Sequence, residues 1–402
     1  MPAQNHSLLN KMMRKVSPSA TYAMIALAQK MKAEGLDVIL LAAGEPDFPT
    51  PAHICDAAIA AIHAGKTKYT PVAGLTSLRK AVCDKFQREN NLSYATEQVL
   101  VSNGGKQVIA AALAVTLDPD DEVIIPTPYW VSYPDMVRLN GATPVIVDTG
   151  KTAKLTPKML QAAISGKTKW LILNSPSNPS GAVYSQSELG ALAGVLRPHQ
   201  RIMVLSDEIY EHLVYGVEFA TIAAVPGFQD RVLVANGVSK SYAMTGWRIG
   251  YGVGPVELIK AMETWQGQVS SGASSISQHA ALQALNGPQD HIREYGGAFE
   301  CRKDLVVSAL AGCEGLKIIP PQGAFYVFAL IDAAMGKQTP KGRVIETDMG
   351  FALGLLEETG VSIVPGSAFG MGPGFRISFA AADPVLADAC GRITSFWASL
   401  RP

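Results

Sequence analysis

The chain has few cysteines, no long apolar run and no excess of either charge. Its 5 cysteines are scattered and form no C-x-x-C pair, which argues against a disulfide framework or a zinc site. The 34 Lys and Arg residues balance the 34 Asp and Glu residues, so no overall field attracts nucleic acid or an anionic membrane. No segment approaches the ~18 consecutive apolar residues that a membrane helix needs. These absences favour a small-molecule partner.

Two further absences concern location and metals. The basic N-terminus is not followed by the apolar stretch of a secretion signal, so we expect a cytoplasmic protein with reduced thiols. The 7 histidines form no H-E-x-x-H motif or comparable cluster, so we expect no metal site.

The length and composition indicate a globular protein of more than one domain. A chain of 402 residues exceeds one ordinary hydrophobic core, and 48% of its residues are apolar against 17% charged. We predict a large domain over residues 46–285. Residues 1–45 and 286–402 would together form a smaller domain.

Short apolar runs alternate with helical stretches from about Gln98 onward. Continuous apolar strands separated by helices are typical of a mostly parallel sheet that is covered on both faces. We therefore predict an α/β large domain with three layers. The expected strands are 99–101, 122–125, 170–173, 203–205 and 232–234, and the expected helices are 105–115, 130–139 and 187–196.

The remaining chain mixes helices with a few short strands, which predicts an α+β small domain. Ser17-Pro18-Ser19 supplies the start signal of an amphipathic helix over 19–34 that ends at Gly35. In the C-terminal part we expect helices over 293–310 and 349–359 and strands over 325–328, 362–364 and 375–379.

Polar residues follow the predicted strands of the large domain. Parallel sheets bind ligands at the carboxyl ends of their strands, so residues at these ends should meet at one edge. The segments concerned are 103–106, 174–181, 207–208 and 239–240.

The segment from Gly237 to Arg248 places Lys240 in a turn of small residues and Arg248 eight positions later. A lysine amine forms a Schiff base only in its neutral form, which a partly buried site near positive charge provides. A protein that holds pyridoxal phosphate needs such a lysine, with an arginine for the phosphate. For the pair alone, a surface lysine beside a capping arginine is the plainer interpretation.

Other residues at the same edge fit a planar, phosphorylated ligand. A carboxylate at Asp207 would pair with a pyridinium N–H, and Tyr210 and Asn178 would donate to the cofactor's 3′-oxygen. Gly104 and Gly105 open a helix whose N-terminus suits a phosphate. Each has an ordinary alternative: a loop for 178–181, a helix cap for Asp207 and packing glycines for 104–105. Trp130 would stack on the ring, or equally be a core tryptophan.

Nine segments, in this order, carry a resemblance to a known family: 17–21, 43–48, 68–69, 104–106, 128–130, 178–181, 206–210, the Lys240 segment and 375–378. From about Val16 to the C-terminus the chain resembles fold-type I, class I pyridoxal-phosphate aminotransferases. It looks most like the bacterial aspartate aminotransferase branch. The resemblance implies the fold of this family and a homodimer with shared active sites.

The resemblance also implies cofactor contacts. Lys240 is expected to form the Schiff base, Asp207 to pair with the pyridinium nitrogen, and Trp130 to stack on the ring. The phosphate is expected to be held by Gly104, Gly105, Lys106, Ser239, Arg248 and, from the neighbouring subunit, Tyr69. Where several relatives have a phosphate-binding serine this chain has Gly237, so Ser239 or the backbone would replace that contact.

For the substrate, the resemblance implies that Arg376 grips the α-carboxylate in a bidentate manner. The backbone of Gly44 and the side chains of Asn178 and Trp130 would assist. Lys106, with Ser19 and Thr21, is expected to bind the side-chain carboxylate of a dicarboxylic substrate; alternatively Lys106 only neutralises the phosphate. Val16-Ser17 stands before Pro18 where many relatives have a lysine, which weighs against larger dicarboxylates such as prephenate.

The expected activity is transfer of the amino group of an L-amino acid, most simply aspartate, to 2-oxoglutarate by a ping-pong mechanism. The catalytic residues would be Lys240, Asp207 and Tyr210. An aminotransferase for aromatic, aliphatic or a broader set of amino acids stays open, as does a β-lyase, because the same cofactor serves both reactions. A pyridoxal-binding regulator is disfavoured, since fewer than twenty residues precede Ser19 and leave no room for a DNA-binding domain.

Overall fold

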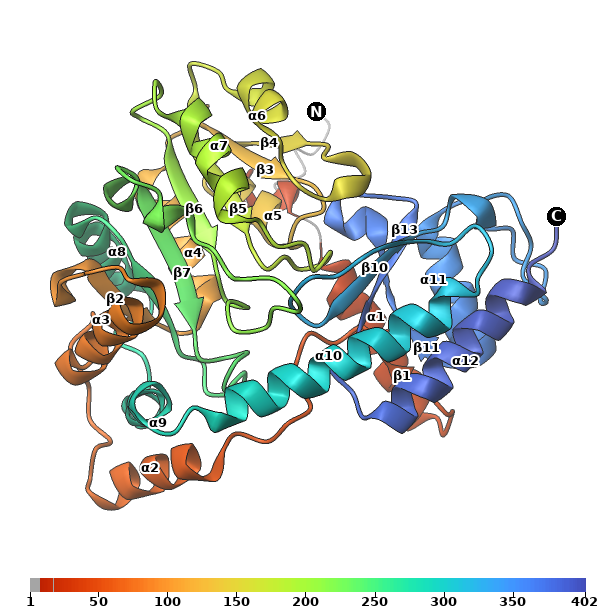
Figure 1. The fold of residues 1–402 in the computed structure, drawn as a ribbon, viewed down its shortest axis with the longest axis horizontal. Helices are drawn as coiled ribbons and strands as arrows, with labels where there is room; N and C mark the ends of the chain where they lie inside the picture. The colour runs from red at the N-terminus through yellow and green to blue at the C-terminus, as the bar shows by residue number, and fades with distance from the viewer. Residues whose placement is uncertain (1–7, 17) are drawn as a thin grey trace, which may run out of the picture.

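The computed structural model describes residues 8–16 and 18–402. Ser17, which belongs to the expected helix start signal and to the departure before Pro18, lies outside the described residues. The elements form two groups, one around a seven-stranded sheet and one around a four-stranded sheet (Figure 1). Within the described part of the chain, no helix is long and apolar enough to cross a membrane.

The larger sheet has the strand order β2-β8-β7-β6-β5-β3-β4. Only β8 runs antiparallel to its neighbours, so the carboxyl ends of the other strands share one edge. The mostly parallel α/β sheet is thereby confirmed. Its strands are β2 (Val99–Ser102), β3 (Glu122–Pro126), β4 (Thr143–Val147), β5 (Thr168–Asn174), β6 (Met203–Asp207), β7 (Val232–Gly237) and β8 (Gly250–Val253).

Both faces of this sheet are buried under helices, as continuous apolar strands require. In β7 the side chains of Val232 and Val234 join one core and that of Leu233 joins the other. The core on one face includes residues of α3 (Thr76–Asn90), α6 (Pro157–Ala163), α7 (Gln186–Leu196) and α9 (Ser275–Asn286), and α2 (Ala52–His63) packs against α9. The other face packs against α4 (Gly105–Thr116), α5 (Tyr133–Leu139) and α8 (Val256–Val269).

The smaller group is built on an antiparallel sheet in the order β12-β13-β10-β9 and a parallel pair, β1 and β11. Its helices are α1 (Ala20–Ala33), α10 (Asp290–Ala311), α11 (Asp348–Thr359) and α12 (Asp383–Ser399). Its strands are β1 (Ile39–Leu40), β9 (Lys317–Ile319), β10 (Tyr326–Leu330), β11 (Val361–Ser362), β12 (Val364–Pro365) and β13 (Gly374–Ser378). The expected α+β character is present. The proposed domain boundaries at residues 46 and 286 stay a prediction.

Helix α10 runs from the end of α9 along the smaller sheet and ties the two groups together (Figure 1). Its buried Arg302 binds the Asp47 carboxylate at 2.7 and 3.0 Å and the Asp383 carboxylate at 3.0 Å. Asp47 belongs to the segment that leaves β1 and crosses toward the edge of the larger sheet. This ion pair therefore anchors the segment that contains Gly44.

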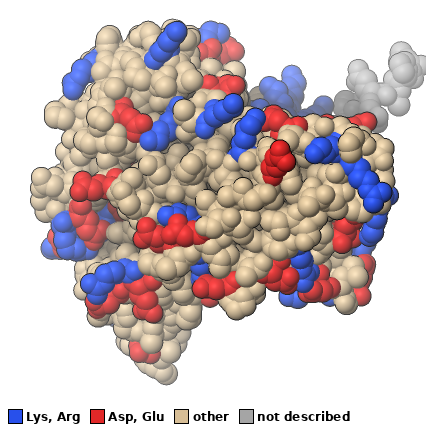
Figure 2. All heavy atoms as spheres, turned by 45° about the vertical axis from the view of Figure 1, so that its right-hand side comes forward, with Lys and Arg blue, Asp and Glu red and all other residues tan. Residues whose placement is uncertain are grey.

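Charged residues are spread over the surface in both signs. On the face drawn in Figure 2, basic and acidic side chains lie interspersed rather than gathered by sign. This distribution agrees with the balance of 34 basic and 34 acidic residues.

Candidate active site

A cavity of about 510 Å³ opens at the carboxyl edge of the larger sheet, against the smaller group. Most of the residues predicted for the site line it: Ser19, Thr21, Gly44, Gly105, Lys106, Trp130, Asn178, Asp207, Tyr210, Ser239, Lys240, Arg248 and Arg376. Gly104 precedes Gly105 in the chain and does not itself line the cavity. Tyr69 is 98% exposed and lies outside the cavity of its own chain.

Lys240 lies in the turn after β7, and its Nζ donates a hydrogen bond of 2.6 Å to the carbonyl of Gly44. Burial lowers the pKa of Lys240 to about 8; Glu45 opposes this shift, whereas Arg248 and Arg376 add to it. A fraction of the amine is therefore neutral near pH 7, which nucleophilic attack on an aldehyde requires.

Asp207 ends β6 at the floor of the cavity. The Tyr133 hydroxyl donates to its Oδ2 at 2.5 Å, and the backbone N–H of Ile209 donates to its Oδ1 at 3.4 Å. Burial raises the pKa of Asp207 to about 6, although these two hydrogen bonds and the charge of Lys240 lower it. A cationic ligand beside this carboxylate would lower its pKa again and keep it ionised.

An anion-binding corner lies where α4 begins. Gly104 has a φ of +85°, and a Cβ at this position would collide with the Arg248 guanidinium. Arg248 is held by bonds to the carbonyls of Thr245 at 3.0 Å and Asn103 at 3.3 Å. Because the N-cap residue Gly104 has no side chain, and no described side chain caps α4 in its place, the first N–H groups of the helix are free to point at a ligand beside this arginine.

Arg376 in β13 is buried on the opposite wall. It donates to Asn178 Oδ1 at 3.0 Å and to the carbonyl of Ala42 at 2.6 Å, and its Nε is buried with no partner in the part of the chain that the structure describes. The guanidinium lies 4.5 Å from the centroid of the Tyr326 ring. An unpaired, buried donor beside a cavity indicates a missing acceptor, and a carboxylate fits the planar fork of arginine.

Helix α1 closes the cavity near Lys106. The Nζ of Lys106 lies 4.8 Å from the centroid of the Trp130 ring, and burial, followed by the charge of Arg248, lowers the pKa of Lys106. The hydroxyls of Ser19 and Thr21 are buried and have no hydrogen-bond partner among the described residues. Two unpaired hydroxyls and an ammonium group thus face one cavity.

The sequence model of the family described as aminotransferase class I and II matches residues 36–393 of the chain. The chain belongs to this aminotransferase family. This result confirms the family that the nine segments indicated.

Individual relatives of the aminotransferase are similar over nearly its whole length. The aspartate/prephenate aminotransferase of Cereibacter sphaeroides is 53% identical and covers 98% of this chain and 100% of its own. The crystal structure of the Rhizobium meliloti aspartate aminotransferase has a TM-score of 0.94 and 48% identity, covering 98% of this chain and 100% of its own. For the Thermus thermophilus aspartate aminotransferase with maleate, the TM-score is 0.90 at 40% identity, with 96% and 99% covered.

Enzymes of this family use pyridoxal phosphate, and the cavity of the aminotransferase has the chemistry for such a group. Four cationic side chains and one carboxylate line it, so it carries an excess of positive charge for a phosphate and a substrate carboxylate. A side chain at Gly237 would meet Gly250 Cα at 2.8 Å and the Ile249 carbonyl at 2.9 Å. Serine therefore does not fit at this position without a shift, which accounts for the departure from relatives.

Several residues of the site were not predicted from the sequence. Tyr326 lines the cavity, and its hydroxyl lies 2.9 Å from that of Tyr210. Tyr133 binds Asp207 from below the cavity, and Asn174 Oδ1 accepts from the backbone N–H of Asn178 at 2.8 Å. An aromatic residue inside a predicted strand or helix carries no local signal that separates a site residue from a core residue.

Proposed function

We propose that this aminotransferase transfers the amino group of L-aspartate to 2-oxoglutarate with pyridoxal phosphate as its cofactor. The main support is a pair of anion-binding groups in one cavity: Arg376 on one wall, and Lys106 with the unpaired Ser19 and Thr21 hydroxyls on another. A dicarboxylic amino acid offers a carboxylate to each. A relative named as aspartate aminotransferase at 50% identity, and another at 40% identity solved with the dicarboxylate maleate, agree with this assignment.

Several of the lining residues have a proposed role toward the cofactor. Lys240 forms the covalent link, and Asp207, oriented by Tyr133, pairs with the ring nitrogen. The start of α4, Ser239 and Arg248 hold the phosphate. When bound, pyridoxal phosphate supplies an electron sink for the pair of electrons that a substrate carbon releases.

Asn178 and Tyr210 complete the cofactor site by donating to the 3′-oxygen, and Trp130 covers the ring face. Asn178 serves a second purpose, because its Oδ1 also accepts from Arg376 at 3.0 Å. This residue therefore fixes the position of the α-carboxylate site relative to the cofactor site.

Lys240, whose amine would be released when the amino group of the substrate takes its place on the cofactor, is the proposed carrier of the proton that leaves the substrate α-carbon. Its lowered pKa, about 8, keeps part of the amine neutral near pH 7, and the Gly44 carbonyl at 2.6 Å fixes the direction of Nζ. A positioned proton carrier of this kind contributes a factor of roughly 10² to 10⁴ to the rate.

A coupled assay tests the substrate assignment. Oxaloacetate should form from aspartate only when 2-oxoglutarate is present, and alanine and phenylalanine should react far more slowly. Release of pyruvate and ammonia from a cysteine conjugate without any oxo acid would instead support a β-lyase. Turnover of alanine or an aromatic amino acid without turnover of aspartate would reassign the substrate.

Prephenate belongs in the same substrate panel. The Cereibacter sphaeroides relative is named for both aspartate and prephenate, whereas Val16-Ser17 before Pro18 weighs against larger dicarboxylates. Aspartate turnover without prephenate turnover would agree with that departure. Comparable turnover of both would show that no lysine before Pro18 is needed.

Two further expectations remain proposals. A homodimer would bring Tyr69, which is 98% exposed in one chain, to the phosphate of the neighbouring subunit. Five free cysteines agree with a reducing, cytoplasmic location.

A further inference from the structure

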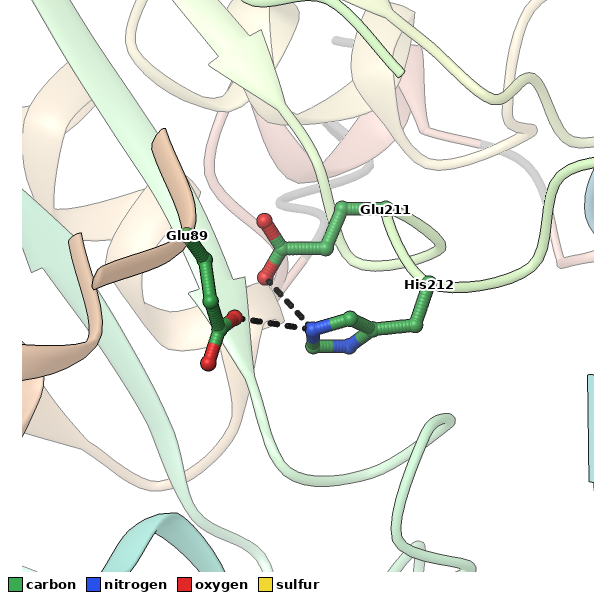
Figure 3. A group of neighbouring side chains, drawn as sticks. All are labelled: Glu89, Glu211 and His212. Atoms are coloured by element: carbon green, nitrogen blue, oxygen red, sulfur yellow. Dashed lines mark hydrogen bonds and ion pairs between the residues drawn. The ribbon is translucent and has the colours of Figure 1, made fainter. Parts of the chain in front are cut away.

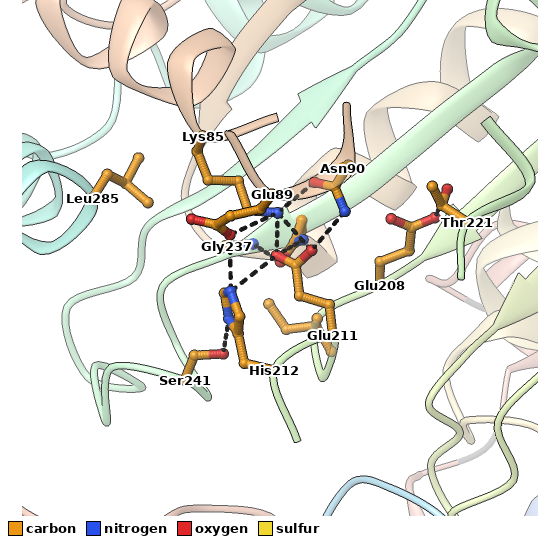
Figure 4. A network of polar contacts seen from close by, with 12 residues as sticks. Lys85, Glu89, Asn90, Glu208, Glu211, His212, Thr221, Gly237, Ser241 and Leu285 are labelled. Carbon is orange, nitrogen blue, oxygen red and sulfur yellow. Dashed lines mark hydrogen bonds and ion pairs between the residues drawn. The ribbon is translucent and has the colours of Figure 1, made fainter. Parts of the chain in front are cut away.

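A partly buried polar cluster lies behind the segment that carries Lys240, outside the cavity. It joins α3, the turn after β6 and residues 236–241 (Figures 3 and 4). We propose that His212 is a positioning residue for the reaction: through Ser241 it fixes the segment that presents Lys240. The inference rests on the proposed function, because it concerns the same lysine.

The ring of His212 bridges helix α3 and the Lys240 segment. Its Nε2 lies 2.9 Å from Glu89 Oε2, and its Nδ1 lies 2.8 Å from Ser241 Oγ. A carboxylate only accepts, so Nε2 carries the proton in this contact. Nδ1 then accepts from the Ser241 hydroxyl, or donates to it when the ring is cationic. In both states the residue directly after Lys240 is held.

Glu211, the residue before His212 in the turn after β6, holds the start of the Lys240 segment. Asn236 Nδ2 donates to Glu211 Oε1 at 2.7 Å, and the backbone N–H of Gly237 donates to Asn236 Oδ1 at 2.7 Å. Consecutive residues, Glu211 and His212, therefore grip the two ends of the turn in which Lys240 lies (Figure 4).

Lys85 fixes the two carboxylates of the cluster. This lysine is 0% exposed, and its Nζ lies 2.5 Å from the Glu211 carboxylate and 3.5 Å from that of Glu89. Although burial raises the pKa of Glu89, its contacts with His212, Lys85 and Arg88 lower the pKa to about 2. The pKa of Glu211 is lowered as well, by Lys85 and His212 against the effect of burial. Both groups thus stay charged anchors at neutral pH.

Two other roles for the cluster fit less well. Glu89, Glu211 and His212 lie close enough to bind a metal ion (Figure 3). However, the Lys85 ammonium already contacts both carboxylates (Figure 4). The order Glu89, His212, Ser241 resembles a nucleophilic triad. However, Ser241 is 3% exposed, and the described residues that line the cavity do not include it.

Stability alone does not account for this arrangement either. Burying an ion pair costs about as much desolvation as its attraction returns, and apolar residues of similar size serve stability as well or better. What the charged cluster adds is a fixed orientation of its side chains, because each group makes its hydrogen bonds in only one geometry. Residues 237 and 241, which contact the cluster, thereby hold the turn that carries Lys240 in one orientation.

Two amide substitutions separate the contacts of His212. His212→Asn places an amide near the position of Nδ1 and keeps the contact with Ser241, whereas His212→Gln places one near Nε2 and keeps only the contact with Glu89. The readouts are the Kd of pyridoxal phosphate for the full-length apoprotein, the visible spectrum of the bound cofactor, and kcat and KM for aspartate. Unfolding in urea reports stability separately.

His212→Gln and Ser241→Ala should each weaken cofactor binding about tenfold and lower kcat by a similar factor, the loss typical of one net side-chain hydrogen bond. KM for aspartate should change less than about twofold, because Arg376 and Lys106 are untouched. His212→Asn should stay within about twofold of the wild type in Kd and kcat. The double variant Ser241→Ala/His212→Gln should be no worse than either single one, since both remove one contact.

His199→Asn is the matched control, because His199 is a half-buried histidine in the loop between α7 and the start of β6, away from the carboxyl edge, and should leave every readout unchanged. The positioning role is overturned if His212→Asn is as impaired as His212→Gln, or if His212→Gln and Ser241→Ala lower only stability in urea. A wild-type protein that neither binds pyridoxal phosphate nor transaminates would overturn the proposed function and this role with it.

Discussion

At the scale of single residues, the charge of Asp207 is the property that pH changes most directly. Burial raises its pKa to about 6 in the free site, so the carboxylate gains a proton as the pH falls through this value. A protonated Asp207 is no charged partner for a pyridinium nitrogen. A raised acid pKa also means that burial of Asp207 costs stability as the pH rises from about 4 to 6.

We predict that the Kd of pyridoxal phosphate increases as the pH is lowered below about 6. Asp207→Asn should bind the cofactor roughly tenfold to a hundredfold more weakly at pH 7.5, the value of one charge-assisted hydrogen bond of about 1.5–3 kcal/mol. Fluorescence titration of the apoprotein between pH 5 and 8 measures both. If Asp207→Asn keeps the same pH dependence as the wild type, another group causes it.

Tyr326 is the second residue with a specific expectation. Tyr326→Phe removes the hydroxyl 2.9 Å from that of Tyr210 and leaves Tyr210 without this partner in a buried site. We expect kcat/KM for aspartate to fall roughly tenfold, because an unsatisfied buried hydroxyl costs about 1–3 kcal/mol and loses its fixed direction.

Tyr215→Phe is the control for this prediction. The Tyr215 hydroxyl is also buried and donates to the carbonyl of Ala324, but the residue does not line the cavity. This variant should be less stable toward urea and keep kcat/KM within about twofold of the wild type. Equal kinetic effects of the two substitutions would argue against a role of Tyr326 in the site.

At the scale of elements, strand β8 and helix α4 approach each other closely behind the phosphate corner. A Cβ at Gly250 would lie 2.9 Å from Gly105 Cα and would collide with the Gly105 nitrogen. We predict that Gly250→Ala displaces the start of α4 and weakens binding of pyridoxal phosphate by at least about tenfold, because the N–H groups of the helix no longer point at the phosphate. Cofactor titration measures this loss.

Gly190→Ala provides the comparison, because a Cβ at this position in α7 meets no atom within 4 Å. Replacing a helical glycine by alanine should stabilise the protein by about 0.5–1 kcal/mol without changing cofactor binding. Unaltered cofactor binding in Gly250→Ala would mean that α4 does not hold the phosphate.

The elements that could be predicted from the sequence are the buried ones with a clear period. Strands β2, β3, β5, β6 and β7 were predicted because both of their faces are apolar. Strand β4 was missed since it is an edge strand with partly exposed residues and Pro144. Strand β8 was missed since two of its four residues are glycines, and its place is set by packing between β2 and β7.

Local interactions also decided where elements begin and divide. Helix α5 begins at Tyr133 rather than Trp130, because the three residues before it form the turn that lines the cavity. The strand expected over 362–364 is two strands, since β11 pairs with β1 and β12 with β13. Lys85 gave no signal, because a lysine in a helical pattern predicts a solvated face until the tertiary partner, Glu211, is known.

At the scale of the whole molecule, the open expectation is the shared active site of a homodimer. Tyr69 is too exposed to serve the cavity of its own chain and is expected to serve that of the partner. Tyr69→Phe alone should weaken binding of pyridoxal phosphate roughly tenfold, because a hydrogen bond to a charged phosphate is lost.

A hybrid of differently tagged Tyr69→Phe and Lys240→Ala chains tests this arrangement. In such a hybrid one of the two sites combines the intact Lys240 of one chain with the intact Tyr69 of the other. About half of the wild-type activity per dimer should return at low cofactor concentration. If the hybrid binds the cofactor no better than the Tyr69→Phe homodimer, Tyr69 does not act between subunits.

The covalent role of Lys240 is the central claim, and reduction of the bound cofactor followed by peptide mass spectrometry tests it most directly. Borohydride treatment of the wild-type protein with pyridoxal phosphate should leave a stable pyridoxyl group on the peptide that contains Lys240. The Lys240→Ala variant should show no such mass and no transamination of aspartate. A label on another lysine, or an unlabelled protein that still transaminates, would contradict the account.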